Sequence, residues 1–197
     1  NNNVALGCKS LNVNTTGIDN VAIGWQTLFK STTAQQNTAV GTMAMACNTT
    51  GCDNVAMGSR AMCSNTTGNL NVSVGRSALR ANTTGKCNTA IGALALTSNT
   101  TGYNNTGVGV CSLYNNTTAT GNTAIGRQSL ALNTIGNNNT AVGQNALYSN
   151  TIGFTNTVVG RNAGYNITSG NQNTIMGDAS ACTLTTGCYN TYVGAEL

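Results

Sequence analysis

Hydrophobic and polar positions recur along this chain with a fixed period of seventeen residues. Asn stands at twelve positions with that spacing, and Gly follows each of them four residues later. The repeat units begin at residues 3, 20, 37, 54, 71, 88, 105, 122, 139, 156, 173 and 190. Self-similarity at a fixed period is typical of repeat architectures, in which each unit stacks on its neighbours. The pattern therefore predicts one repeat domain that covers residues 1–197.

Each unit has the same order of small, aliphatic and polar places, which we number from its first Asn. Place two is Val or Thr, place three is usually Ala, and place four is aliphatic or Met. Place nine is Leu or Met in the first nine units, place twelve is mostly Asn, place thirteen is Thr, and place fifteen is mostly Gly. The unit that begins at Asn139 shows this order, with Val142 at place four and Leu147 at place nine.

A unit of this length is too short for a helical repeat, which needs more than about 30 residues. It has room for two short strands, one at places two to four and one at places eight to ten. Asn-Thr-Thr-Gly then supplies a turn, because Gly and Asn tolerate left-handed backbone conformations. The sequence predicts an all-β fold, a parallel β-solenoid or β-roll of about twelve coils with two strands in each.

We expect the large apolar side chains at places four and nine to form one continuous core. At place four these residues are Ile23, Val40, Met57, Val74, Ile91, Ile125 and Val142. At place nine they are Leu28, Leu79, Leu96, Leu130 and Leu147.

Identical polar residues stacked at the coil spacing can form side-chain ladders. The Asn column of place one is the first candidate, and the Asn column of place twelve, from Asn14 to Asn150, is the second. The Thr column of place thirteen can bond through its hydroxyls. The alternative is that these residues only cap tight turns. Representative ladder residues are Asn20, Asn37, Asn54, Asn88, Asn122, Asn139, Thr49, Thr66, Thr83 and Thr100.

Three stretches carry a family resemblance: Asn20-Val-Ala-Ile-Gly24, Asn54-Val-Ala-Met-Gly58 and Asn88-Thr-Ala-Ile-Gly92. They resemble the head repeats of trimeric autotransporter adhesins, and the Asn-Thr-Thr-Gly segments are similar to repeats of phage and viral tail fibres. The resemblance implies a left-handed β-roll, a homotrimer and binding to a host surface or matrix. The present unit is longer than the adhesin unit, with the extra residues around Asn-Thr-Thr.

Composition excludes several function classes. Asn and Thr make up about a third of the chain, His is absent, and only 6% of residues are charged. A catalytic triad with His cannot form, and the four carboxylates are scattered. The eight basic residues form no cluster of the kind that nucleic acids need. No apolar run spans a membrane. We expect no enzyme activity, cofactor, metal site, nucleic-acid partner or membrane insertion.

The eight cysteines fall in variable places and show no Cys-x-x-Cys spacing, which argues against a zinc site. Cys47 and Cys63 lie at neighbouring places of adjacent units, within reach of a disulfide. Cys182 and Cys188 flank one turn and form a second possible pair. Unpaired surface cysteines are the alternative.

These observations favour a structural role outside the cell. We expect a subunit or segment of an extracellular fibre or filament, on a cell or virion surface, that assembles through open solenoid ends. A trimeric adhesin head or a tail-fibre shaft that binds a host surface, matrix or glycan is the alternative. The Thr column of place thirteen leaves ice binding as a further alternative. We expect aromatic residues such as Tyr114, Tyr148 and Tyr165 to be single surface side chains.

Overall fold

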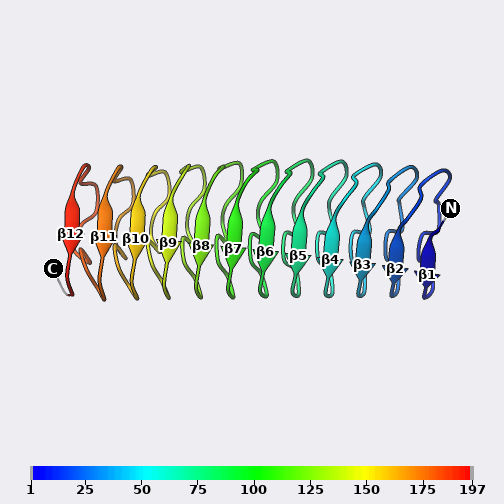
Figure 1. Ribbon diagram of the computed structural model, residues 1–197, viewed down its shortest axis with the longest axis horizontal. Coiled ribbons are helices and arrows are strands. Elements are labelled where there is room, and N and C mark those ends of the chain that lie inside the picture. The colour runs from blue at the N-terminus through cyan, green and yellow to red at the C-terminus, as the bar shows by residue number, and fades with distance from the viewer. Residues whose placement is uncertain (1, 196–197) are drawn as a thin grey trace.

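The computed structural model describes residues 2–195 and shows a straight rod of stacked coils (Figure 1). The described part of the chain contains no helix and has one three-residue strand in each coil. The all-β parallel solenoid predicted from the sequence is therefore confirmed, apart from its second strand. The strands are β1 (Val4–Leu6), β2 (Val21–Ile23), β3 (Thr38–Val40), β4 (Val55–Met57), β5 (Val72–Val74), β6 (Thr89–Ile91), β7 (Thr106–Val108), β8 (Thr123–Ile125), β9 (Thr140–Val142), β10 (Thr157–Val159), β11 (Thr174–Met176) and β12 (Thr191–Val193).

All twelve strands form one parallel sheet in chain order, and each residue pairs with the residue seventeen positions later. The glycine at place five ends each strand, with φ between +126° and +140°. A Cβ atom on Gly41 would lie 2.7 Å from the carbonyl carbon and oxygen of Gly58 in the next coil. Glycine at this place therefore serves both the backbone turn and the close approach of successive coils.

The second predicted strand, at places eight to ten, is not a strand. The backbone there forms a turn, with positive φ at places seven and nine; Leu96 has φ 51° and Leu130 has φ 49°. A β-strand requires negative φ, so regular pairing stops here. Hydrogen bonds between coils continue nonetheless: the N–H of Leu96 donates to the carbonyl of Ser112 at 2.9 Å.

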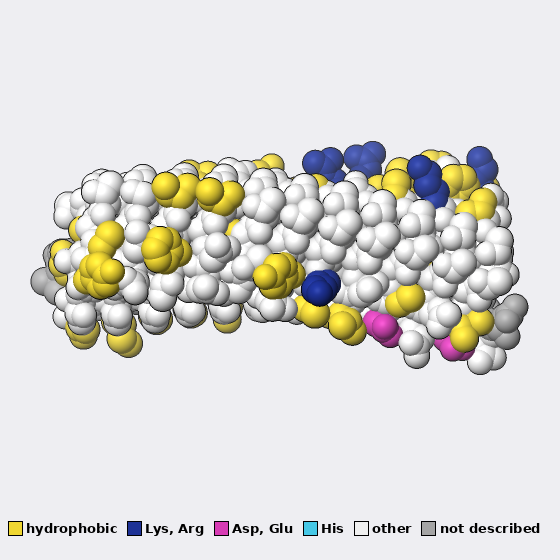
Figure 2. All heavy atoms as spheres, turned by 90° about the horizontal axis from the view of Figure 1, so that it is seen from above, with side chains coloured by type: hydrophobic (Ala, Val, Ile, Leu, Met, Phe, Trp, Pro, Cys, Tyr) yellow, Lys and Arg dark blue, Asp and Glu magenta, His cyan; other side chains and the backbone are white. Residues whose placement is uncertain are grey.

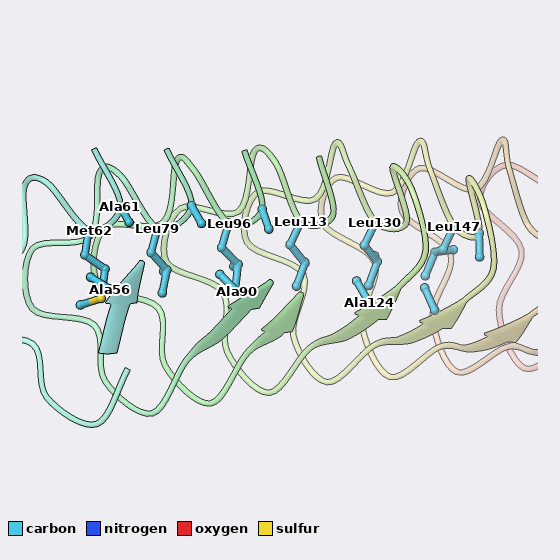
Figure 3. Packing of buried hydrophobic residues seen from close by; sticks show 14 of the residues in the cluster. Ala56, Ala61, Met62, Leu79, Ala90, Leu96, Leu113, Ala124, Leu130 and Leu147 are labelled. Carbon is cyan, nitrogen blue, oxygen red and sulfur yellow. The ribbon is translucent and has the colours of Figure 1, made fainter. Parts of the chain in front are cut away.

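The core consists of the side chains at places three, eight and nine. From Leu28 to Leu147 the Leu and Met side chains of place nine are fully buried, and Figure 3 shows Leu79, Leu96, Leu113, Leu130 and Leu147 in one row above Ala56, Ala90 and Ala124. A left-handed conformation costs roughly 1–2 kcal/mol for a non-glycine residue. Burial of a whole Leu side chain contributes a similar or larger amount, about 1.5–3 kcal/mol. The predicted core leucines Leu28, Leu79, Leu96, Leu130 and Leu147 are confirmed.

The prediction that place four belongs to the core is wrong. Successive side chains of a strand point to opposite faces. Because the alanines of place three are fully buried, places two and four must face outward. Met57, Ile91 and Ile125 are 45%, 41% and 42% exposed. The predicted residues that lie on this outer face are Ile23, Val40, Met57, Val74, Ile91, Ile125 and Val142.

Near the C-terminus the core keeps its volume by exchanging large and small residues. Place nine becomes Gly164, and the space of the missing leucine is taken by Val158, Ile167 and Ile175, all fully buried. A Cβ atom on Gly164 would lie only 3.1 Å from Ile167 Cδ1 and 3.4 Å from Ile175 Cδ1. Coils with different residues therefore fill the same cross-section.

Two truncations in one coil test which face is the core. We expect Leu130→Ala to lower the free energy of unfolding by about 3 kcal/mol, because it opens a cavity in the row of leucines. We expect Ile125→Ala to lower it by about 1 kcal/mol or less, because that side chain already contacts water. Urea unfolding of both variants measures the difference. Equal costs would contradict the assignment of place four to the outer face.

Candidate functional site

The Asn residues of place one form a buried amide ladder that runs the length of the rod. Asn88 Nδ2 donates to Asn71 Oδ1 at 3.2 Å and to the carbonyl of Gly102 at 2.8 Å. Its own Oδ1 accepts from the backbone N–H and Nδ2 of Asn105 at 3.0 and 3.1 Å. All amide hydrogen-bonding groups are thus satisfied away from water. The ladder predicted from the sequence is present at every coil junction from Asn3 to Asn190.

A second amide ladder occupies place twelve and also closes the turn. Asn82 Nδ2 donates to Asn65 Oδ1 and to the carbonyl of Gly85, three residues ahead. The amides therefore form a ladder and cap turns at once, so the two readings of the sequence do not exclude each other. The ladder runs without a gap from residue 48 to residue 150.

Ser31 interrupts this second ladder in the second coil. Asn14 Oδ1 and Ser31 Oγ are buried there without a hydrogen-bond partner. Asn48 Nδ2 keeps only its bond to the carbonyl of Gly51. Ile167 ends the ladder in the same way at its other end, where Asn150 Oδ1 is buried and has no partner.

We expect Ser31→Asn to raise the free energy of unfolding by about 2 kcal/mol. The new amide would donate to Asn14 Oδ1 and accept from Asn48 Nδ2, and each such hydrogen bond is worth about 1 kcal/mol. Ala34 does not prevent this, because Asn116 and Ala119 already combine the same two residue types. Chemical unfolding measures the change, and exposed Ser59→Asn is the control. A lower stability of Ser31→Asn would contradict the conclusion that Ser31 leaves two hydrogen bonds of this ladder unmade.

The Thr residues of place thirteen bond to the backbone of the next coil. Thr66 Oγ1 donates to the carbonyl of Thr83 at 3.0 Å, and the N–H of Thr66 donates to the same oxygen. The hydroxyls are therefore committed to carbonyl groups and do not bond to one another. The hydroxyl oxygens keep lone pairs that can accept hydrogen bonds from water, and ice binding by this column stays a prediction.

At both ends of the described rod, the amide ladder of place one has hydrogen-bonding groups that no neighbouring coil within residues 2–195 uses. At the first coil, Asn3 Nδ2 donates to the carbonyl of Gly17, and within residues 2–195 no other Asn accepts from it. At the last coil, Asn190 donates to Asn173 Oδ1, and among residues 2–195 no donor reaches its own Oδ1. The edge strands are uncovered as well, with Leu6 65% and Val193 67% exposed. The two ends thus carry complementary unpaired groups.

The outer face of the sheet carries an aliphatic column at place four, from Leu6 to Val193. Its members are exposed or half-buried in every coil. Places two and four hold only Val, Thr, Leu, Ile and Met, so this face has no charged side chain of its own. Figure 2 views the rod from an adjoining side and shows basic side chains mostly over its N-terminal half. A long uncharged face of this kind suits contact with another apolar surface.

All eight cysteines are free thiols in this structure. The N–H of Cys47 donates to the carbonyl of Cys63 at 3.0 Å, so this pair is adjacent across two coils. Burial, and then the neighbouring Cys47, raises the pKa of the Cys63 thiol, which lowers its thiolate fraction and slows exchange. Cys188 Sγ lies against Thr186 and Asn171, whereas Cys182 lines a surface hollow beside Tyr165. Both disulfide pairs stay predictions.

Among residues 2–195, an ion pair between Arg161 and Asp178 joins two neighbouring coils. Asp178 accepts two hydrogen bonds from Arg161 at 2.9 and 2.7 Å, which lower the pKa of that exposed carboxyl. The ion pair is therefore fully formed above the ordinary pKa of Asp and is lost as the pH falls through the lowered value. No group of three or more His, Cys, Asp or Glu side chains in the described chain is placed to hold a metal ion. That part also has no helix long and apolar enough to cross a membrane.

The sequence did not reveal that aromatic residues gather at place ten. Tyr148 and Tyr165 stack across neighbouring coils with ring centroids 5.0 Å apart and planes inclined by 6°. Tyr114 and Tyr148 border a hollow on the same side of the rod. The signal was available, because these residues share place ten of their units, but place ten varies too much for the pattern to stand out.

Comparison with known proteins gives no match: no family model, no curated protein and no solved structure matches the chain. The fold itself defines the class of the protein, a parallel β-solenoid with internal amide ladders.

Proposed function

We propose that this chain is a structural segment of an extracellular fibre that grows by end-to-end stacking of its coils. The observation that carries this proposal is the complementarity of the two open ends. In the interior, each Asn of place one donates its N–H and Nδ2 to Oδ1 of the preceding coil. Asn3 uses one Nδ2 proton on the carbonyl of Gly17 and can offer its N–H and its second Nδ2 proton to another coil, and Asn190 has the matching acceptor.

A junction between copies would repeat the geometry of an interior junction. Asn3 of one copy would donate to Asn190 Oδ1 of the other, and β1 would pair with β12 in the register of the remaining sheet. Such a contact uses different surfaces on the two copies, and contacts of that kind build open filaments unless they close into a ring.

The internal structure of the rod supports a mechanical role. The sheet and the amide ladder of place one run along the rod axis and join every pair of successive coils, and the ladder of place twelve adds hydrogen bonds between residues 48 and 150. Uncovered strand edges recruit further strands, and soluble proteins usually blunt or cover them. Here β1 keeps the residue pattern of the interior strands, β12 differs from it by Tyr192 at place three, and neither strand has Pro or a charged residue.

The aliphatic column of place four supports a second candidate, a trimeric adhesin head or fibre shaft built from rods packed side by side. That packing would cover the outer face of the sheet and leave the ends unaffected. The two candidates therefore depend on different surfaces, and one experiment on a single substitution separates them.

Asn3→Asp tests the axial joint. We expect the unmodified chain to form filaments many times longer than one rod, which is about 50 Å long from its coil spacing. We expect Asn3→Asp to give single short rods, because a carboxylate would replace the Nδ2 donor and face the amide oxygen of Asn190. Within the rod, the new carboxylate still accepts from Asn20. Negative-stain electron microscopy and sedimentation velocity measure the lengths and masses.

Asn12→Asp is the matched control, since it adds the same charge to an exposed residue of the same coil outside the ladder. It should form filaments like the unmodified chain. Short rods from the unmodified chain, or long filaments from Asn3→Asp, would reject axial stacking. A discrete trimer that survives Asn3→Asp would favour the lateral candidate.

A further inference from the structure

Place ten forms a column of side chains along one side of the rod. From the seventh to the tenth coil this column reads Tyr114, Ala131, Tyr148 and Tyr165. Tyr148 and Tyr165 show that rings in adjacent coils stack face to face, with centroids 5.0 Å apart. The spacing between coils therefore allows aromatic rings at place ten to stack on one another. Ala131 occupies place ten between Tyr114 and Tyr148, so the stack has no ring in that coil.

The missing ring leaves a hollow of about 370 Å³ on the surface. Tyr114 and Tyr148 line it from the two coils that flank Ala131, whose side chain is only 4% exposed and lies at its base. The volume falls within the range of small-ligand sites, about 300–1,000 Å³. The other lining residues are Leu94, Cys111, Asn115, Gln128 and Leu132.

The spacing of the coils sets the thickness of a guest. Two coil spacings separate the positions of Tyr114 and Tyr148 along the axis, about 9.6 Å. Contact between carbon atoms takes about 3.5–4.0 Å on each side, so a flat ring would fill only about 7–8 Å of this gap. A saturated six-membered ring in its chair form is thicker because of its axial hydrogens, and it fills the gap better.

The polar groups of the hollow match a neutral, hydroxylated ring. The faces of the tyrosine rings carry partial negative charge and attract the weakly positive C–H groups of a saturated ring. The Asn115 and Gln128 amides each offer both a donor and an acceptor to hydroxyl groups, and no charged side chain lines the hollow. An anionic or cationic guest would find no counter-charge there.

We propose that this hollow binds one pyranose ring of a neutral polysaccharide between Tyr114 and Tyr148. A second hollow lies beyond Tyr165, lined by that ring together with Asn162, Asn166 and Cys182. Since the two hollows belong to one side of the rod, an extended sugar chain can contact both. The proposal concerns the side of a single rod and holds whether or not rods join at their ends.

The test fills the hollow without removing any of its walls. Ala131→Tyr places the missing ring in the stack, in the arrangement that Tyr148 and Tyr165 already show. Thr97→Tyr is the matched control, because it adds a ring at place ten on the other side of Tyr114. The probes are cellohexaose, xylohexaose, mannohexaose and chitohexaose, with p-cresol as a flat aromatic probe, each titrated at millimolar concentration.

Ring resonances of Tyr114 and Tyr148, followed by nuclear magnetic resonance, report binding at the hollow. We expect saturable shifts with at least one oligosaccharide, an affinity at least tenfold lower in Ala131→Tyr, and an affinity within twofold of the unmodified chain in Thr97→Tyr. Tyr114→Ala, which removes one wall, should also lose binding and covers the case in which Ala131→Tyr does not fold. The proposal is overturned by no binding of any of the four sugars, by undiminished binding in Ala131→Tyr, or by tighter binding of p-cresol than of every sugar.

Discussion

Asn88→Ala will lower the free energy of unfolding by about 4 kcal/mol, although it removes only one small polar side chain. The N–H and Nδ2 of Asn105 lose their acceptor, and the carbonyl of Gly102 and Asn71 Oδ1 each lose a donor. Each of these four lost hydrogen bonds contributes about 1 kcal/mol. Only the N–H of Asn105 is left with no partner, because Asn71 Oδ1 keeps the N–H of Asn88, the carbonyl of Gly102 keeps Asn99 Nδ2, and Asn105 Nδ2 keeps the carbonyl of Ala119. Because Asn88 is fully buried, water does not readily replace the lost bonds.

Guanidinium unfolding, followed by circular dichroism, measures this cost. Asn115→Ala is the control, because it removes the same amide from a place outside both ladders; we expect a change within about 0.5 kcal/mol. Asn88→Asp separates hydrogen bonding from volume, since it keeps the acceptor for Asn105 but removes the donors to Asn71 and Gly102. A cost of Asn88→Ala no larger than that of Asn115→Ala would mean that the ladder contributes nothing to stability.

Gly92→Ala will lower the free energy of unfolding by about as much as Asn88→Ala. We expect it to weaken the junction between β6 and β7, so that the coils on either side unfold as two separate parts. Gly92 has φ 133°, and a Cβ atom there would lie 2.5 Å from the carbonyl oxygen of Gly109 in the next coil. The carbonyl of Gly109 belongs to the backbone and cannot rotate away like a side chain, so the backbones of the two coils must move apart. Backbone strain of about 1–3 kcal/mol adds to the cost of overpacking. We expect a total loss of about 4 kcal/mol.

Hydrogen exchange locates the damage, because each coil contacts only its neighbours and stability is roughly a sum of local terms. Amides of β6 and β7 should exchange first, whereas those of β2 and β11 should keep their protection. Gly107→Ala is the matched control. Gly107 lies in a strand whose paired residues are Ala90 and Ala124, and a Cβ atom there would lie 3.0 Å from Ser112 Oγ, a side-chain atom that can shift. The lower entropy of the unfolded chain offsets this contact, so we expect a change within about 1 kcal/mol. Similar effects of the two alanines would contradict the special role of place five.

The period of the sequence made the stacking predictable. A strict seventeen-residue repeat admits one register, in which Ala90 lies beside Gly107 and Asn88 beside Asn105. Both amide ladders follow from that register, because identical side chains then lie one coil spacing apart. The parallel sheet, its chain order and the buried leucines of place nine follow in the same way.

The choice of the inner face was not predictable from side-chain size. Place four holds larger apolar residues than place three, and size alone favours Ile125 over Ala124 for the core. The structure buries Ala124 completely and leaves Ile125 42% exposed. The reason is the leucine of place nine, which occupies most of the narrow interior and leaves room only for alanine opposite it.

What the sequence by itself determined is the stacking of units along the axis: the solenoid, its register, the Asn-Thr-Thr-Gly turn and the two amide columns. The tertiary structure alone decided the path of the chain within one coil. Leu96 and Leu130 adopt left-handed backbone angles that a local pattern does not predict, because only burial of their side chains offsets the strain. It also decided that Tyr114, Ala131 and Tyr148 meet in one hollow, since a contact between variable places depends on three coils together.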